Sequence, residues 1–184
     1  LQSILSLCGP TLASERSYNN DIGVPLTLLR LRDEHQYAVV EMGANHPGAI
    51  AELVDVVDPS VAMITLAAAS HLAGFGDLQG VAKAKSEIFS GMSESGVAII
   101  NQDDAFAPFW HEVKGQRASI TFGIHQQADL MAQAISLDQQ ACPTFDLVIA
   151  EQTVTVKLGL LGRHHVMNAL AAAAAAYAIK IPLS

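Results

Sequence analysis

Three short segments of the sequence contain the residue types that metal and phosphate chemistry requires. Glu41-Met-Gly-Ala-Asn-His46 carries a carboxylate and an imidazole, His71-Leu-Ala-Gly-Phe-Gly76 carries a second imidazole, and Ala82-Lys-Ala-Lys-Ser-Glu-Ile-Phe89 carries two lysines. A carboxylate is a hard oxygen ligand that suits Mg²⁺, and a lysine can act as a point charge beside phosphate oxygens. Together the segments indicate part of an ATP-using active site.

The two lysines differ in what they can do. Lys83 and Lys85 are two residues apart, so they lie on different faces of a helix and one can be functional while the other is solvated. A lysine that is partly desolvated keeps some neutral amine, which can react with carbon dioxide to give a carbamate that ligates Mg²⁺. Taken singly, each lysine, histidine or glutamate is more often an ordinary structural or surface residue.

Two polar segments are further candidates for ligand contacts. Asn19-Asn20-Asp21-Ile-Gly23 is a turn-forming cluster that could hold a polar substrate or cap a helix. Gly162-Arg-His-His-Val-Met-Asn168 precedes an alanine-rich run and would lie at the positive end of a helix, where nucleotide contacts or simple capping are both possible.

The elements that position these residues follow a strand–helix alternation. Short apolar runs that end in a polar residue predict buried parallel strands at 37–41, 61–65 and 97–101, and helical patterns lie between them at 47–56, 78–89 and 106–113. This alternation is typical of a doubly wound sheet. Partial alternation then predicts an antiparallel extension at one edge, from the runs 118–122, 130–135, 144–149 and 153–158. A final alanine-rich helix is expected at about 164–179.

Composition limits the possible functions. The chain has 184 residues, 51% of them hydrophobic, which is enough for one substantial core. Its net charge of -8 argues against sequence-independent nucleic-acid binding. Cys8 and Cys142 are too few and too far apart for a disulfide framework or a zinc site, and the apolar run 169–179 is too short to cross a membrane. A cytoplasmic protein without membrane insertion is expected.

One component of a typical ATP site is absent from the sequence. The chain contains no Gly-Lys-Ser or Gly-Lys-Thr, which ends the glycine-rich loop that holds phosphates with backbone N–H groups. Residues 1–8 resemble the last turns of a helix, with Gly9-Pro10 as its stop signal. The chain is therefore expected to start inside a domain.

Taken in chain order, five blocks resemble the Mur ligases of bacterial cell-wall synthesis, and the resemblance covers essentially the whole chain. The blocks are Asn19-Asn-Asp-Ile-Gly-Val-Pro25, Glu41-Met-Gly-Ala-Asn-His-Pro-Gly48, His71-Leu-Ala-Gly-Phe-Gly76, Gly80-Val-Ala-Lys-Ala-Lys-Ser-Glu-Ile-Phe89 and Gly162-Arg-His-His-Val-Met-Asn168. The resemblance implies that residues 1–184 form the central ATPase domain of such a ligase. The implied fold is α/β, a doubly wound, mostly parallel sheet with an antiparallel edge extension. The first strand, the phosphate loop and both flanking domains would be missing.

The resemblance also implies roles for individual residues. Glu41 would ligate the Mg²⁺ that bridges the ATP phosphates, His71 would ligate a second Mg²⁺, and Lys85 would be carbamylated to complete that second site. On the cofactor side, the residues near the adenine would be Asn168, His165 and Arg163. On the substrate side, the residues near the UDP-muramoyl peptide would be Asn19, Asn20 and Asp21.

The activity implied by the resemblance is ATP-dependent amide-bond formation through an acyl phosphate. The blocks resemble most the members that join D-alanyl-D-alanine to UDP-N-acetylmuramoyl-tripeptide, so these two molecules are the expected partners of the intact protein, which is expected to act as a monomer. ATP and Mg²⁺ are the expected cofactors. The isolated chain is expected to be inactive. Two alternatives stay open: a non-catalytic module that binds the UDP-muramoyl peptide, and a degenerate remnant.

Overall fold

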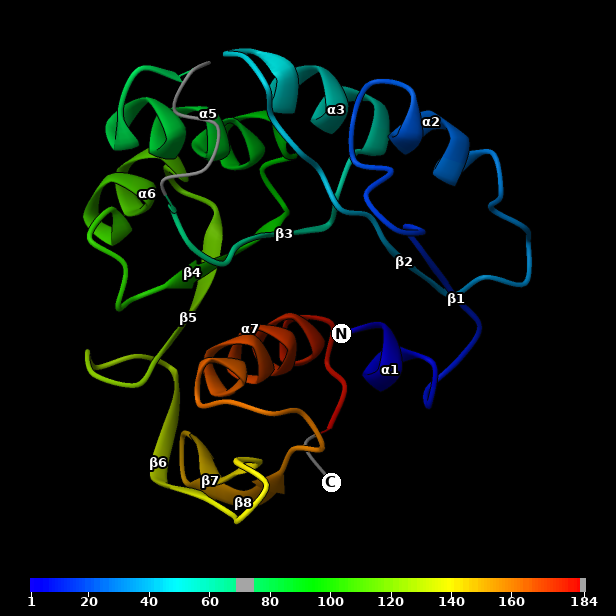
Figure 1. The fold of residues 1–184 in the computed structure, drawn as a ribbon. Coiled ribbons are helices and arrows are strands. Elements are labelled where there is room, and N and C mark those ends of the chain that lie inside the picture. Colours follow the sequence, from blue (N-terminus) through cyan, green and yellow to red (C-terminus); the bar gives the residue numbers. More distant parts are fainter. Residues whose placement is uncertain (69–74, 183–184) are drawn as a thin grey trace.

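The computed structural model describes residues 1–68 and 75–182. The helices are α1 (Gln2–Leu5), α2 (Gly23–Leu28), α3 (Ala49–Val57), α5 (Leu78–Gly91), α6 (Ala107–Val113) and α7 (His164–Ala178). The strands are β1 (Thr11–Ala13), β2 (Tyr37–Val39), β3 (Val61–Ile64), β4 (Val97–Asn101), β5 (Ala118–Gly123), β6 (Leu130–Leu137), β7 (Pro143–Ile149) and β8 (Gln152–Lys157). Figure 1 shows their arrangement.

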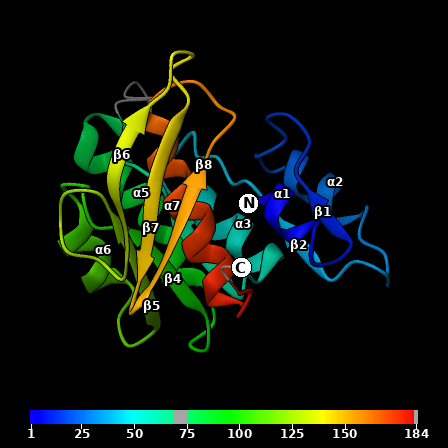
Figure 2. The same cartoon turned by 90° about the horizontal axis from the view of Figure 1, so that it is seen from below.

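The main sheet has six strands in the order β3-β4-β5-β6-β7-β8. Strands β3 to β6 pair in parallel, and β6, β7 and β8 pair antiparallel. In Figure 2 these last three strands lie side by side at one edge. The structure thus confirms the predicted α/β fold with a mostly parallel sheet and an antiparallel edge extension.

One strand of that extension was assigned the wrong direction. Segment 118–122 was expected to be antiparallel, but β5 pairs in parallel with β4, Val97 opposite Ala118. The reason is α6, which lies between the two strands in sequence and returns the chain to the edge where β4 began. A parallel pair requires such a crossover.

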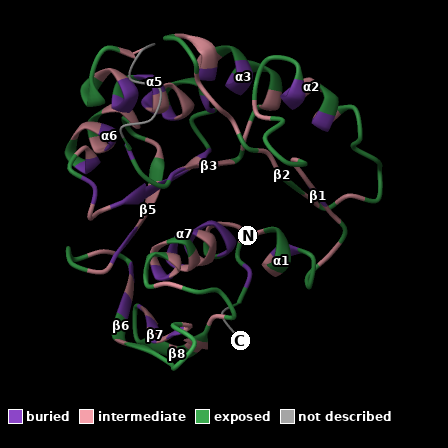
Figure 3. Ribbon diagram, in the orientation of Figure 1, coloured by how far each residue is buried: buried purple, intermediate pink, exposed green. Residues whose placement is uncertain are grey.

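Strand β4 shows how the sheet divides the core into two layers. Its side chains alternate, so Ala98 and Ile100 face one side with Phe89 of α5 and Trp110 of α6, whereas Ile99 faces the other side with α7. All five of these residues are 0% exposed. The helices α5 and α6 and the helix α7 therefore cover opposite faces of the sheet, as Figures 1 and 3 show.

A second, two-stranded sheet was not expected. Strand β2 pairs in parallel with β1, with Tyr37 opposite Thr11, rather than with the main sheet. Strand β1 escaped prediction because three residues after a proline carry too little periodicity to be recognised. Tyr37 and Val39 pack beside Leu5 of α1 and the end of α7, and this contact attaches the small sheet to the rest of the domain.

The predicted helices are all found, with ends that shift by a few residues. The short α1 ends before Gly9-Pro10, as the stop signal indicated. In α7, alanines such as Ala171 and Ala174 are buried, because their small side chains let the helix lie close to the sheet. Within the described ranges, no helix combines the length and apolarity that a membrane span needs.

Asp103 holds the loop that follows β5, and its replacement by alanine is expected to lower the free energy of unfolding by about 2–3 kcal/mol. Its carboxylate accepts hydrogen bonds from the backbone N–H groups of Ile124 (2.7 Å), His125 (3.1 Å) and Gln126 (2.7 Å). Urea unfolding measures the effect, with Asp55→Ala on the exposed face of α3 as the control. Equal unfolding free energies for the two variants would contradict this role.

Candidate functional site

The loop after β2 holds Glu41 in a defined position. The backbone N–H of Glu41 donates to the Ser14 hydroxyl (3.0 Å), and the Asn19 Nδ2 donates to Glu41 Oε1 (2.8 Å). The backbone N–H of Gly43 donates to the Asn19 carbonyl (2.7 Å). The carboxylate is therefore oriented by the segment 14–19, which follows β1 in the chain.

Helix α5 separates the two lysines as their spacing predicted. The helix begins with an N-terminal cap, since the Asp77 carboxylate accepts from the Gly80 N–H (2.7 Å). It buries Val81 and Ala84 against the rest of the domain. Lys83 is exposed, whereas Lys85 is partly buried.

Glu41 and Lys85 line the same cleft, which has a volume of about 360 Å³. The prediction that these two residues converge is thus consistent with the geometry. The other lining residues come from the segment 14–19, the Glu41 loop, α3, α5 and the start of the described chain after residue 74; they are Ser17, Asn19, Met42, Gly43, Ala44, Asn45, Ile50, Phe75, Val81 and Ala84. A carboxylate and an amine in one cleft can serve a cation and a phosphate together.

The environment of Lys85 favours its neutral form more than water does. Burial lowers the pKa of the Lys85 ammonium below its usual value, and the negative charges of Asp104 and Glu41 oppose this by raising it. The net shift is downward. A larger fraction of neutral amine is what carbamate formation requires.

Asp104 acts on this site through its charge, which raises the pKa of Lys85, and it was not among the predicted site residues. It is only 7% exposed, and its carboxylate accepts from the backbone N–H groups of Ala67 (2.9 Å) and Phe106 (2.8 Å). Asn101, at the end of β4, likewise donates from Nδ2 to the carbonyl of Thr65 (2.8 Å). The two residues fix the chain just after β3 to the chain just after β4. A polar run at the end of a buried strand was the available signal.

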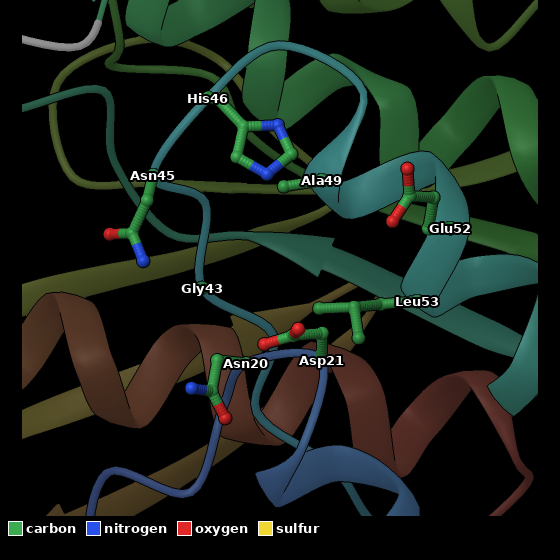
Figure 4. Close-up of a pocket in the computed structure, with 8 residues that line it drawn as sticks. All are labelled: Asn20, Asp21, Gly43, Asn45, His46, Ala49, Glu52 and Leu53. Atoms are coloured by element: carbon green, nitrogen blue, oxygen red, sulfur yellow. The ribbon is translucent and has the colours of Figure 1, made fainter.

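A smaller pocket of about 100 Å³ adjoins the cleft and shares Gly43 and Asn45 with it. Figure 4 shows Asn20 and Asp21 on one side of this pocket, with His46 and Glu52 on the other. The Asn20 carboxamide also accepts from the Gly23 N–H (2.8 Å). Asn20 therefore binds the backbone N–H of the first residue of α2 through its side chain. A substrate role for Asn20 and Asp21 stays a prediction.

Glu87 anchors the start of α3, which follows the Glu41 loop in the chain. Its Oε1 accepts from the Gly48 N–H (2.8 Å) and its Oε2 from the Ala51 N–H (3.2 Å). A carboxylate is favourable at a helix N-terminus because the unpaired N–H groups there carry partial positive charge. The contact joins α5 to α3 and so fixes the wall of the cleft that carries Ile50.

The residues expected near adenine lie at the first turns of α7. Arg163 is exposed directly before the helix, and the side chains of His165 and Asn168 approach each other, Nδ1 to Nδ2, at 3.5 Å. None of the three lines either of the two pockets just described. Their nucleotide role stays a prediction.

His71 lies outside the described residues, so its proposed place in the metal site is not part of this geometry. Across residues 1–68 and 75–182, no group of three or more histidine, cysteine, aspartate or glutamate side chains could hold a metal ion. The described part of the predicted metal site is therefore the pair Glu41 and Lys85.

The fold and the cleft define a doubly wound α/β domain with its candidate site at the ends of the strands, where open sheets of this kind bind ligands. The family model described as "Mur ligase middle domain" matches residues 1–176, and this chain belongs to the Mur ligase family.

Named relatives point to one branch of the family. The chain is 48% identical over 173 residues to the UDP-N-acetylmuramoyl-tripeptide--D-alanyl-D-alanine ligase of Escherichia coli. The aligned region covers 94% of this chain and 38% of that ligase. A crystal structure of MurF from Acinetobacter baumannii superposes with a TM-score of 0.94 at 41% identity, covering 98% of this chain and 39% of that one. MurF from Thermotoga maritima in complex with ADP shares the fold, with a TM-score of 0.83 at 22% identity and a coverage of 98% and 42%.

These coverages also define what the chain represents. It spans less than two-fifths of the length of the Escherichia coli ligase. The shared region is the one that the family model describes as a middle domain.

Proposed function

We propose that this domain is the central ATP-binding domain of a ligase that joins D-alanyl-D-alanine to UDP-N-acetylmuramoyl-tripeptide in peptidoglycan synthesis. The observation that carries the proposal is the location of Glu41 and Lys85 in one cleft of a Mur ligase middle domain. Support for this branch of the family comes from the 48% identity to the Escherichia coli ligase. The reaction would take place in the cytoplasm, where ATP is available.

The residues of the cleft fit Mg²⁺ and the phosphates of ATP in charge and donor type. Glu41 offers carboxylate oxygens, which Mg²⁺ prefers, and Asn19 holds that carboxylate. Lys85 offers either a cation for phosphate or, as a carbamate, further oxygens for the metal. When bound, Mg²⁺ and ATP would supply the activation of the peptide carboxylate by phosphoryl transfer.

The remaining roles belong to the same proposal. His71 would ligate a second Mg²⁺ together with carbamylated Lys85. Arg163, His165 and Asn168 would contact the adenine region, and Asn20 and Asp21 would border the peptide substrate. The carboxylate of the peptide substrate would approach Lys85 in the cleft. Cations there would stabilise the negative charge that develops in the transition state.

The experiment is a ligation assay with the intact protein that contains this domain. ADP release and the mass of the ligated UDP-muramoyl-pentapeptide are measured with both substrates, Mg²⁺ and ATP, and again with each component omitted. Product that requires all four supports the proposal. Saturable binding of the UDP-muramoyl peptide without any ADP release would instead favour the non-catalytic module, and no binding at all would favour the remnant.

The isolated 184-residue chain serves as the second sample. It is expected to release no ADP, because the phosphate-holding loop is not in its sequence. Robust ATP hydrolysis by the isolated chain would overturn that expectation.

A further inference from the structure

Asn19 forms hydrogen bonds to the Glu41 loop with both its side chain and its backbone. The side chain donates from Nδ2 to Glu41 Oε1 (2.8 Å), and the backbone carbonyl accepts from the Gly43 N–H (2.7 Å). Glu41 itself is an exposed residue, whereas Asn19 is half-buried. The two contacts of the half-buried Asn19 therefore orient the exposed Glu41 carboxylate.

The chemistry of the contact determines which atom of the carboxamide faces Glu41. A carboxylate only accepts hydrogen bonds, so the NH₂ group of Asn19 must face it. The bond is charge-assisted, and bonds of this kind are stronger than those between neutral groups. With Nδ2 committed to Glu41, the amide of Asn19 has less capacity for a second partner.

Gly43 provides the space for this amide. A Cβ at position 43 would lie 2.8 Å from Asn19 Cγ and Nδ2 and 2.9 Å from Oδ1, which is closer than carbon atoms tolerate. The absence of a side chain at Gly43 thus allows the loop after β2 to close over Asn19.

We infer that Asn19 is a positioning residue that orients Glu41 for its cation. Gly43, which has no side chain, leaves the space that this contact requires. The inference rests on the proposed function of Glu41 as a Mg²⁺ ligand. It differs from the substrate-contact role that the resemblance implied for Asn19. Partners of this kind, which hold a ligating carboxylate without touching the metal, commonly contribute 10- to 100-fold to metal affinity.

The experiment uses the intact protein and Mn²⁺ as the probe, with bound and free ion measured by electron paramagnetic resonance. Asn19→Ala and Gly43→Ala are each expected to weaken Mn²⁺ binding about 10-fold. Asn19→Asp is expected to bind Mn²⁺ more weakly still. It removes the hydrogen bond to Glu41 and places a second carboxylate against it, so the two groups repel each other. The double variant Asn19→Ala/Gly43→Ala is expected to equal either single one, since both disturb the same contact.

The control is Glu15→Gln, on the same segment, whose exposed side chain pairs with Arg30 (2.7 Å) and does not line the cleft. It is expected to bind Mn²⁺ as the wild type does. In the ligation assay, Asn19→Ala should raise the Mg²⁺ concentration needed for activation about 10-fold and leave the KM for the UDP-muramoyl peptide unchanged.

The outcomes separate this inference from the proposed function. If Glu41→Ala weakens Mn²⁺ binding but Asn19→Ala does not, the positioning role is overturned and the metal role of Glu41 stands. If neither variant changes Mn²⁺ binding, both are overturned. A raised KM for the peptide substrate with unchanged Mg²⁺ activation in Asn19→Ala would overturn the inference in favour of direct substrate contact.

Discussion

Replacing Lys85 by methionine in the intact protein is expected to lower the ligation rate by about 10²–10³-fold, the scale for losing a group that stabilises charge in a transition state. The unfolding free energy is expected not to fall. Lys85 is partly buried and its ammonium is destabilised there, as its lowered pKa indicates, so an uncharged side chain of similar length is tolerated. Loss of activity without loss of stability distinguishes a functional residue from a structural one.

Lys83→Met is the matched control, because it makes the same change two residues earlier in α5, on an exposed side chain. It should retain the wild-type rate. Steady-state ligation assays and urea unfolding of both variants make the comparison. Equal rates for the two variants, or a large loss of stability in Lys85→Met, would refute the assignment.

The lowered pKa of Lys85 also gives stability a pH dependence with a defined sign. Between the pKa in the folded protein and the higher pKa in the unfolded chain, the unfolded state binds more protons at Lys85. The unfolding free energy contributed by Lys85 therefore rises with pH through that window, and below the folded pKa burial of the charge is fully destabilising. The wild type should show this rise and Lys85→Met should lack it.

The main sheet could be predicted because its strands are buried on both faces. The runs 61–65 and 97–101 are continuously apolar, which is the pattern of parallel strands covered by helices on both sides, and β3 and β4 are such strands. The alanine-rich run after residue 163 was equally clear, since α7 has no competing signal. Strand direction was harder: nothing in the segment 118–122 says which neighbour it pairs with.

The small sheet of β1 and β2 could not be predicted from its own residues. Each strand has three residues, and its stability depends on distant partners such as Leu5 and the end of α7. For the site, the residue types at 41 and 85 pointed to one cleft. The contacts of Asn19, Glu87 and Asp103 were not foreseen. Asn19 donates to a side chain 22 residues away, and Glu87 and Asp103 accept from backbone N–H groups of distant segments, so none of them leaves a local pattern.

Asp104 should prove important for both stability and pH dependence. Asp104→Asn keeps the size of the side chain but replaces one accepting oxygen by an NH₂ group, which must then face the N–H of Ala67 or Phe106. Leaving a buried donor unsatisfied and removing charge-assisted bonds should lower the unfolding free energy by about 2–4 kcal/mol. The ligation rate should also fall, since Ala67 lies four residues before His71 in the chain.

The pH profile of Asp104→Asn provides a test that a purely structural role does not predict. The Asp104 charge raises the pKa of Lys85, so its removal lowers that pKa further. If the neutral amine of Lys85 is needed, the acidic limb of the ligation rate should move to lower pH in this variant. The matched control Asp103→Asn should lose stability but keep the limb where the wild type has it, because the Lys85 ammonium responds to Asp104 and Glu41. If the acidic limb of Asp104→Asn lies at the same pH as in the wild type, Lys85 is not the group whose titration limits the reaction.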